Sequence, residues 1–489
     1  MDIIKLSAVE IALKIQQREI TAMDTAQAFI KQIKKVEDCV DAFLYFNENE
    51  VLSTAKKVQL QIEDLLKEKK PLPPLAGVPI AIKDNICTKG IATTCASKML
   101  EGFVPSYDAT VIDKLKKNLL IPIGKLNMDE FAMGSSNEYS AIKNTKNPWN
   151  IEYVPGGSSG ASAASVASLM APLSIGSDTG GSVRQPAAFC GITGLRPTYG
   201  RVSRYGLVAF ASSLDQIGPL AKDAASCSAL FDIISGADDK DSTSQKDDYL
   251  TTYDKINDFK KPTIALVDEY MNQDISPEMR STVKNIASMF KKMGCNIINI
   301  SIPSLKYALS AYYVLSSAEA SSNLSRYDGV RYGHRTQDAK TIDELYIKSR
   351  SQGFGEEVKR RIMLGTYALS SGYYDKYYDE AQKARTLIKH EFKEAFKKTD
   401  LILCPTTSST AFKFGTNIND TSMYMADFFT VGASLAGLPA SSFVGGFNVE
   451  MLPLGMQLIG PYDSESILMS SIHAFQLQTD YHKMTPEGI

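Results

Sequence analysis

The pattern of hydrophobic and polar residues at the start of the chain predicts helices. Apolar residues recur at helical intervals after Ser7 and after Thr21, and each of these two residues is followed three positions later by an acidic residue, as in a capping box. We expect two or three helices that extend to about Leu66. The charged run 67–70 and the proline-rich segment 71–74 end this helical region.

Farther along the chain, short apolar runs alternate with helical patterns. The apolar runs predict strands over the segments 78–85, 119–123, 171–176, 263–267, 296–302, 401–404 and 452–459. The helical patterns occupy 109–118, 161–170, 223–234, 277–293, 305–397 and 464–478. This order predicts an α/β fold with one mixed β-sheet that many helices cover. The polar segment 237–262 is expected to form a long connection at the surface.

Composition narrows the class of protein. Lys and Arg number 53 against 55 Asp and Glu, a net charge of -2, so no overall basic field attracts nucleic acid or an acidic membrane. The seven cysteines are scattered without a Cys-x-x-Cys pair, which favours reduced thiols over a disulfide frame or a zinc site. The start of the chain does not resemble a secretion signal, and no apolar run has membrane-spanning length. We expect a soluble intracellular protein, with any RNA contact local or made by a partner.

Two turns rich in glycine and serine flank the predicted helix 161–170 and contain the candidate chemistry. The first is Gly-Gly-Ser-Ser-Gly at 156–160, and the second is Asp-Thr-Gly-Gly-Ser at 178–182. A nucleophilic serine needs a base for its proton and donors for the developing oxyanion. Ser182 could provide the hydroxyl, and the backbone N–H groups of its turn could provide the donors. An ordinary glycine turn that caps the next helix is an equally good interpretation of this tetrad alone.

Lys83 is the second candidate, because it ends an apolar strand. A lysine in that position is more often a surface charge whose stem covers apolar groups. If it were buried among hydroxyl groups at the edge of the sheet, however, its pKa would fall and the neutral amine could act as a base.

Ser158 allows two other interpretations. Gly156-x-Ser158-x-Gly160 has the spacing of a nucleophile elbow, which would require a preceding strand and a catalytic histidine. The preceding segment 147–155 contains two prolines, and the histidines lie in polar or amphipathic contexts. A phosphate-binding loop is the other alternative, but neither glycine-rich nucleotide motif is present at this loop. A lysine-based site is favoured because it needs no histidine.

Three separate motifs, which contain Lys83, Ser158 and Ser182, together resemble those of the amidase signature family. The resemblance implies one large α/β domain over 71–489, with the signature region at about 75–220 and a helical segment 1–70 packed on the core. It implies Ser182 as the nucleophile, Ser158 as a bridging serine after a cis peptide bond, and Lys83 as the base. The implied oxyanion hole consists of the backbone amides of Thr179, Gly180, Gly181 and Ser182.

Within that family the chain resembles, from end to end, the ammonia-supplying subunits of tRNA-dependent amidotransferases. The stretches that carry this resemblance are 125–134, 321–329, 353–362, 370–375 and 423–427. It implies a glutaminase in a heterotrimer with subunits B and C, located in the cytoplasm of a bacterium or in an organelle of a eukaryote. ATP, Mg²⁺ and charged tRNA would be bound by the B partner, with no cofactor or metal in this chain. A free-standing amidase that acts on another small amide is the alternative.

Glutamine carries an α-carboxylate and an α-ammonium, so its pocket needs a cation and an anion. The resemblance assigns Arg361 to the carboxylate, with Arg360 as the alternative, and Asp427 to the ammonium, with Tyr313 nearby. A structural ion pair or a core tyrosine is the competing interpretation of these residues.

Two segments depart from the family pattern. Ala161 replaces a usual glycine, which we expect to be tolerated if that residue is helical, and 443–450 differs from the usual proline- and cysteine-containing segment. The second departure leaves the local loop shape open.

Overall fold

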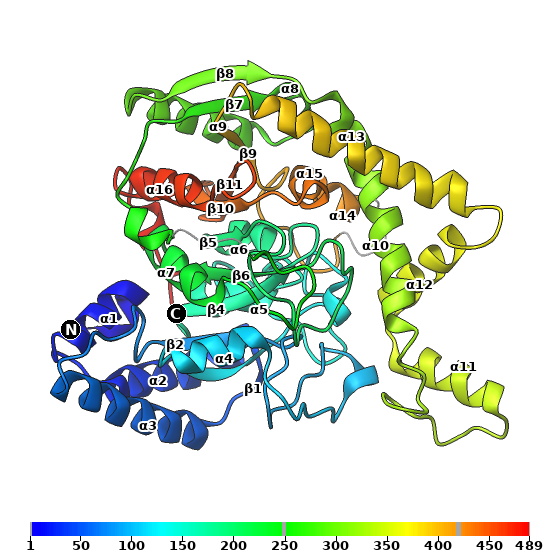
Figure 1. Ribbon diagram of the computed structural model, residues 1–489, viewed down its shortest axis with the longest axis horizontal. Coiled ribbons are helices and arrows are strands. Elements are labelled where there is room, and N and C mark those ends of the chain that lie inside the picture. Colours follow the sequence, from blue (N-terminus) through cyan, green and yellow to red (C-terminus); the bar gives the residue numbers. More distant parts are fainter. Residues whose placement is uncertain (1, 247–250, 417–421, 489) are drawn as a thin grey trace.

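A single eleven-stranded mixed sheet runs through the part of the chain that the computed structural model describes, residues 2–246, 251–416 and 422–488 (Figure 1). In order across the sheet, the strands are β1 (Phe43–Tyr45), β3 (Ile121–Leu126), β2 (Pro79–Lys83), β4 (Leu173–Asp178), β6 (Gln216–Ala221), β5 (Thr193–Arg196), β10 (Ala440–Phe447), β11 (Pro453–Ile459), β9 (Leu401–Pro405), β7 (Thr263–Val267) and β8 (Asn296–Ile300). β2 pairs in parallel with β3 and β4, and β7 pairs in parallel with β8 and β9. The remaining pairings are antiparallel, so the α/β fold with a mixed sheet is confirmed.

Three helices precede β2, as the sequence predicted: α1 (Ala8–Gln16), α2 (Ala22–Val40) and α3 (Glu48–Lys67). Ser7 and Thr21 form the expected capping boxes, in which each side chain accepts a hydrogen bond from the N–H three residues later. The apolar faces of these helices, including Phe29, join the same buried core as the sheet. The short strand β1 between α2 and α3 was not predicted.

Helices cover both faces of the sheet and extend along one side of it (Figure 1). Those that pack on or beside the sheet are α4 (Thr110–Lys117), α5 (Gly160–Ala167), α6 (Arg184–Cys190), α7 (Ala224–Ile234), α8 (Asp268–Met271), α9 (Pro277–Lys292), α15 (Phe428–Ala436) and α16 (Glu465–Gln476). The predicted helical block 305–397 contains α10 (Ala308–Leu324), α11 (Ile342–Gly353), α12 (Glu356–Ala368) and α13 (Glu380–Ala395), and α14 (Ser422–Met425) follows later. Short 3-10 turns lie at Ile3–Lys5, Lys98–Leu100, Glu130–Ala132, Tyr253–Lys255, Pro303–Tyr307 and Tyr481–Lys483, and a π turn lies at Asp375–Asp379.

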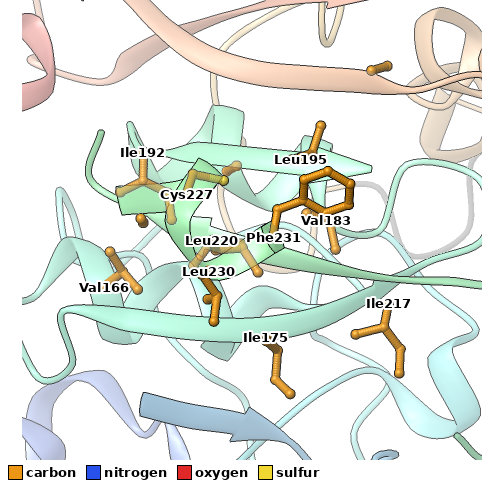
Figure 2. Packing of buried hydrophobic residues seen from close by; sticks show 14 of the residues in the cluster. Val166, Ile175, Val183, Ile192, Leu195, Ile217, Leu220, Cys227, Leu230 and Phe231 are labelled. Atoms are coloured by element: carbon orange, nitrogen blue, oxygen red, sulfur yellow. The ribbon is translucent and has the colours of Figure 1, made fainter. Parts of the chain in front are cut away.

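The hydrophobic pattern did not predict β5, β6 or β10, all of which lie in the middle of the sheet. Figure 2 shows why the first two belong to the core: Leu195 of β5 and Leu220 of β6 lie in one buried cluster with Phe231 of α7. Glycine and proline interrupt the apolar pattern of β6, yet the glycine is required there. A Cβ on Gly218 would lie 2.1 Å from the Leu195 carbonyl oxygen of the neighbouring strand.

The two segments that depart from the family pattern have regular structure. Ala161 is buried in the first turn of α5, as we expected for a tolerated replacement. Residues 443–447 belong to β10.

The polar connection 237–262 is only partly a solvated loop. Asp238 accepts hydrogen bonds of 2.5 Å from the hydroxyl groups of Thr110 and Ser203, and Asp241 is buried beside Arg204. These two carboxylates bind the start of the connection to the rest of the fold. Residues 247–250 of the connection lie outside the described residues.

Every helix in the described residues is too short or too polar to traverse a lipid bilayer.

Candidate active site

Lys83 ends β2 with its side chain fully buried, so the surface interpretation of this lysine is wrong. Its Nζ lies 2.7 Å from Ser158 Oγ, 2.8 Å from Ser159 Oγ and 3.0 Å from Ser177 Oγ. Among the described residues, no carboxylate lies within ion-pair distance of this amine. The Lys83 amine is therefore buried and hydrogen-bonded to three serine hydroxyl groups. This is the buried environment that a lysine base requires.

Burial lowers the pKa of Lys83 to about 7, although the carboxylates of Asp129, Asp178 and Asp215 act in the opposite direction. Desolvation disfavours the ammonium form, and the distant carboxylates only partly compensate for it. Near neutral pH a large fraction of the amine is therefore unprotonated and able to accept a proton.

The Gly-Gly-Ser-Ser-Gly turn presents Ser158 to this amine. The peptide bond between Gly157 and Ser158 is cis, as the resemblance implied. A Cβ on Gly157 would lie 2.0 Å from Asp129 Oδ2, so only glycine fits between the turn and that buried carboxylate. The Gly157 N–H donates to Gln185 Oε1 at 2.8 Å, which ties the turn to α6. Ser158 is completely buried and its hydroxyl contacts Lys83.

The turn that carries Ser182 is fixed by a buried charge network at the end of β4. Asp178 accepts hydrogen bonds from the Val183 N–H at 3.2 Å, from Arg184 Nε at 3.1 Å and from Arg196 Nη1 at 2.9 Å. Burial alone would raise the pKa of Asp178, but the two arginines outweigh that effect and hold its pKa well below the usual range. Asp178 therefore stays charged and holds the turn against the start of α6.

The backbone amides of Thr179, Gly180, Gly181 and Ser182 donate to no acceptor within the described residues. Gly181 has a φ of +144°, and a Cβ there would lie 2.5 Å from Thr430 Oγ1. The Thr430 hydroxyl donates to the Gly180 carbonyl at 2.5 Å, which holds this part of the turn against α15. The arrangement leaves a set of free N–H groups beside Ser182, as an oxyanion hole requires.

Ser182 is 8% exposed, whereas Lys83 and Ser158 are completely buried. Its carbonyl accepts a hydrogen bond from the Ser159 N–H at 3.0 Å, which joins the two glycine-serine turns. Its hydroxyl forms no hydrogen bond with the described residues. The structure thus brings Lys83 and Ser158 into direct contact and leaves the Ser182 hydroxyl reachable from outside.

The three residues expected to bind the substrate lie close together, although they belong to different elements. Tyr313 lies on α10, Arg361 on α12 and Asp427 at the start of α15. Tyr313 donates its hydroxyl to Asp427 Oδ2 at 2.6 Å, and the guanidinium carbon of Arg361 lies 4.8 Å from the centre of the Tyr313 ring. Burial raises the pKa of Asp427 to about 6, although Tyr313, Arg361 and Ser135 favour the charged form. A buried cation and a buried anion therefore border the same tyrosine.

Of the two candidate arginines, Arg361 is the one that lies buried beside Tyr313. Arg361 is 4% exposed and donates through Nε to Glu357 at 2.8 Å, whereas the Arg360 side chain is 49% exposed. The sequence did not reveal that Ser135 contacts Asp427 or that Glu357 contacts Arg361. Ser135 directly follows the 125–134 stretch that resembles the family, and Glu357 lies inside the 353–362 stretch, so only their neighbourhood gave a signal.

An α/β sheet that presents a buried lysine to the Gly-Gly-Ser-Ser-Gly turn, with a second glycine-serine turn joined to the first, is the arrangement expected of an amidase. The family model for amidases matches residues 24–469, and the chain belongs to that family. The A subunit of glutamyl-tRNA(Gln) amidotransferase from Sulfurihydrogenibium sp. (strain YO3AOP1) is 51% identical over 492 residues, which cover 100% of both chains. The protein of the same name from Geobacillus thermodenitrificans (strain NG80-2) is 51% identical, with 98% of each chain covered.

A crystal structure of the A subunit of glutamyl-tRNA(Gln) amidotransferase from Thermotoga maritima superposes with a TM-score of 0.82. The two chains are 38% identical, and the match covers 99% of this chain and 98% of that one. The family and the fold class expected from the sequence are therefore confirmed.

Proposed function

We propose that this protein is the glutaminase subunit of a tRNA-dependent amidotransferase. It hydrolyses glutamine to glutamate and supplies ammonia for the conversion of Glu-tRNA(Gln) to Gln-tRNA(Gln) in a partner subunit, and of Asp-tRNA(Asn) to Asn-tRNA(Asn) where that partner accepts it. The observation that carries the proposal is the pair of opposite buried charges, Arg361 and Asp427, on either side of Tyr313. Such a pair matches the α-carboxylate and α-ammonium of a free amino acid amide. Full-length relatives that bear this name support it.

In the proposed mechanism, Ser182 Oγ attacks the carboxamide carbon of glutamine. Ser158 takes the proton of Ser182 and passes its own proton to the neutral Lys83 amine, which lies 2.7 Å away. The free N–H groups of residues 179–182 stabilise the tetrahedral oxyanion. The proton then returns to the leaving nitrogen, ammonia departs, and water releases glutamate from the acyl-enzyme.

Partner subunits complete the proposed enzyme. The relatives carry the name of one lettered subunit of a larger assembly, which supports partners B and C in a heterotrimer. The net charge of -2 agrees with an arrangement in which the B partner binds the charged tRNA, together with ATP and Mg²⁺. All seven cysteines are free thiols, which supports a reducing compartment such as the bacterial cytoplasm.

Glutamate release separates this function from that of a free-standing amidase. We expect the full chain, co-expressed with its partner subunits, to release glutamate from glutamine, and we expect charged tRNA and ATP to increase the rate. The same preparation should hydrolyse simple aliphatic and aromatic amides slowly, because they lack the two charges that Arg361 and Asp427 accommodate. Rapid hydrolysis of such amides by the chain alone would favour the free-standing amidase.

Asp427→Asn should raise the KM for glutamine roughly tenfold or more while kcat changes little, since it removes the partner of the α-ammonium. Asparagine keeps an oxygen that can accept from Tyr313, so the pocket should keep its shape. Because the pKa of Asp427 is about 6, the wild-type KM should also rise as the pH falls below 6 and the carboxylate becomes neutral.

Glutaramate, which is glutamine without its α-amino group, is the matched substrate for this test. It should be hydrolysed with a similar KM by Asp427→Asn and by the wild type. An unchanged glutamine KM in the variant would remove Asp427 from the substrate pocket.

A further inference from the structure

Glu357 is a buried carboxylate in the first turn of α12 with no role in the steps described above. It is 2% exposed, and it accepts hydrogen bonds from Arg361 Nε at 2.8 Å and from Arg360 Nη1 at 2.6 Å. The Tyr424 hydroxyl contacts it from another part of the chain at 3.3 Å. A fully buried carboxylate persists in a fold only when such partners compensate its desolvation.

The contact with Tyr424 links α12 to the segment that carries Asp427. The Tyr424 ring lies 4.7 Å from the Tyr313 ring, centre to centre, and its carbonyl accepts a hydrogen bond from the Asp427 N–H at 3.2 Å. Figure 1 shows α14, which contains Tyr424, near the helices α10 and α12. Glu357 therefore connects the two elements that supply the opposite charges of the pocket.

The hydrogen bond to Glu357 also determines which part of Arg361 remains available. Within the described residues the Arg361 guanidinium donates only through Nε, so its two Nη groups have no protein acceptor. A guanidinium held through Nε presents its Nη groups as a planar pair of donors, which suits a carboxylate. Without Glu357, the long Arg361 side chain would lose its single anchoring hydrogen bond.

We propose that Glu357 is a positioning residue for glutamine recognition. It orients Arg361 so that the Nη groups face the α-carboxylate, and through Tyr424 it sets the spacing between Arg361 and Asp427. The proposal rests on the proposed glutaminase function and assigns to Glu357 a part of its substrate selectivity.

The test compares two substrates in the complex of the full chain with its partner subunits. Glutamine has the α-carboxylate that Arg361 would bind, and 4-aminobutanamide is glutamine without that group. We expect Glu357→Ala to raise the KM for glutamine about tenfold, the scale of one lost hydrogen bond to a charged group, with kcat within about twofold. The kcat/KM for 4-aminobutanamide should stay within about twofold of the wild type, because this substrate does not use Arg361.

Glu357→Gln is the conservative variant, since its amide oxygen can still accept from Arg361 Nε. It should raise the glutamine KM about threefold, between the wild type and Glu357→Ala. Glu356→Gln is the matched control on the same turn. The Glu356 side chain is 86% exposed and pairs with Lys359 at the surface, so its replacement should leave both substrates unaffected.

Two results would overturn the role of Glu357. One is an unchanged or lower glutamine KM in both Glu357 variants. The other is an equal loss of kcat/KM on glutamine and on 4-aminobutanamide, which would indicate a structural role without selectivity. A wild-type complex that released no glutamate from glutamine would overturn the proposed function itself, so the two failures are distinguishable.

Discussion

Ser182→Ala is expected to abolish glutamine hydrolysis, with a loss of about four orders of magnitude or more in kcat. The reason is that the acyl-enzyme cannot form without the hydroxyl group. The Ser182 hydroxyl forms no hydrogen bond with the described residues, so its removal leaves none of them without a hydrogen-bond partner, and the residue as a whole is 8% exposed. Glutamate release measures the loss of activity, and a thermal midpoint within about 2 °C of the wild type would show that the fold survives.

Hydroxylamine and a second serine variant control this experiment. Hydroxylamine intercepts an acyl-enzyme, so the wild type should form γ-glutamyl hydroxamate and Ser182→Ala should form none. Ser174→Ala is the matched serine variant, because Ser174 lies on β4 and its hydroxyl donates to the Ser162 carbonyl at 2.7 Å. We expect it to stay active. Substantial activity in Ser182→Ala would place the nucleophile at another residue, with Ser158 as the next candidate.

Burial supports Ser182 over Ser158 as the proposed nucleophile, although Ser158 has the spacing of a nucleophile elbow. Ser158 has no exposed surface, and its hydroxyl is occupied by Lys83. A nucleophile must reach the substrate carbon, and only Ser182 lies at an accessible surface with free N–H groups beside it. The sequence had already disfavoured Ser158 as an elbow nucleophile, because the segment before it contains two prolines and the histidines lie in polar or amphipathic contexts.

Local signals in the sequence predicted the neighbouring parallel strands β2, β3 and β4 well. The strands β2, β3 and β4 and the helices between them follow the apolar runs and helical periods, because parallel strands are buried on both faces. The sequence placed Lys83 at the end of a strand, and the structure adds that this strand lies beside β4, whose end leads to Ser182. This topology also explains the contact between Lys83 and Ser177 of β4.

The proposed glutamine-binding residues could not be predicted in the same way. Tyr313, Arg361 and Asp427 belong to different helices or their ends, and nothing in their local sequences links them. The resemblance to the amidase signature family supplied these residues, and the packing of α10 on α12 brings the first two together. Glu357 and Tyr424 carried no signal of their own, because a glutamate in the first turn of a helix is ordinarily a favourable surface residue.

Lys83→Met is expected to lower kcat/KM for glutamine by about three orders of magnitude, because it removes the base that receives the proton of Ser182 through Ser158. In the wild type, kcat/KM should rise with pH through an apparent pKa near 7, since only the neutral amine of Lys83 can accept a proton. The variant should lose this rise. A pH profile from 5.5 to 9 in the complex with the partner subunits measures both effects.

Stability provides the control for Lys83→Met. The substitution leaves three hydroxyl groups without their shared partner, which costs stability, but it also removes a buried amine whose charged form is disfavoured. Because the pKa of Lys83 is lower in the folded protein than in the unfolded chain, this residue destabilises the fold near pH 7, and the penalty diminishes as the pH rises toward 10. The two effects oppose each other, so we expect a thermal midpoint within about 5 °C of the wild type at pH 7. A folded variant with near-normal activity would exclude the lysine-base mechanism.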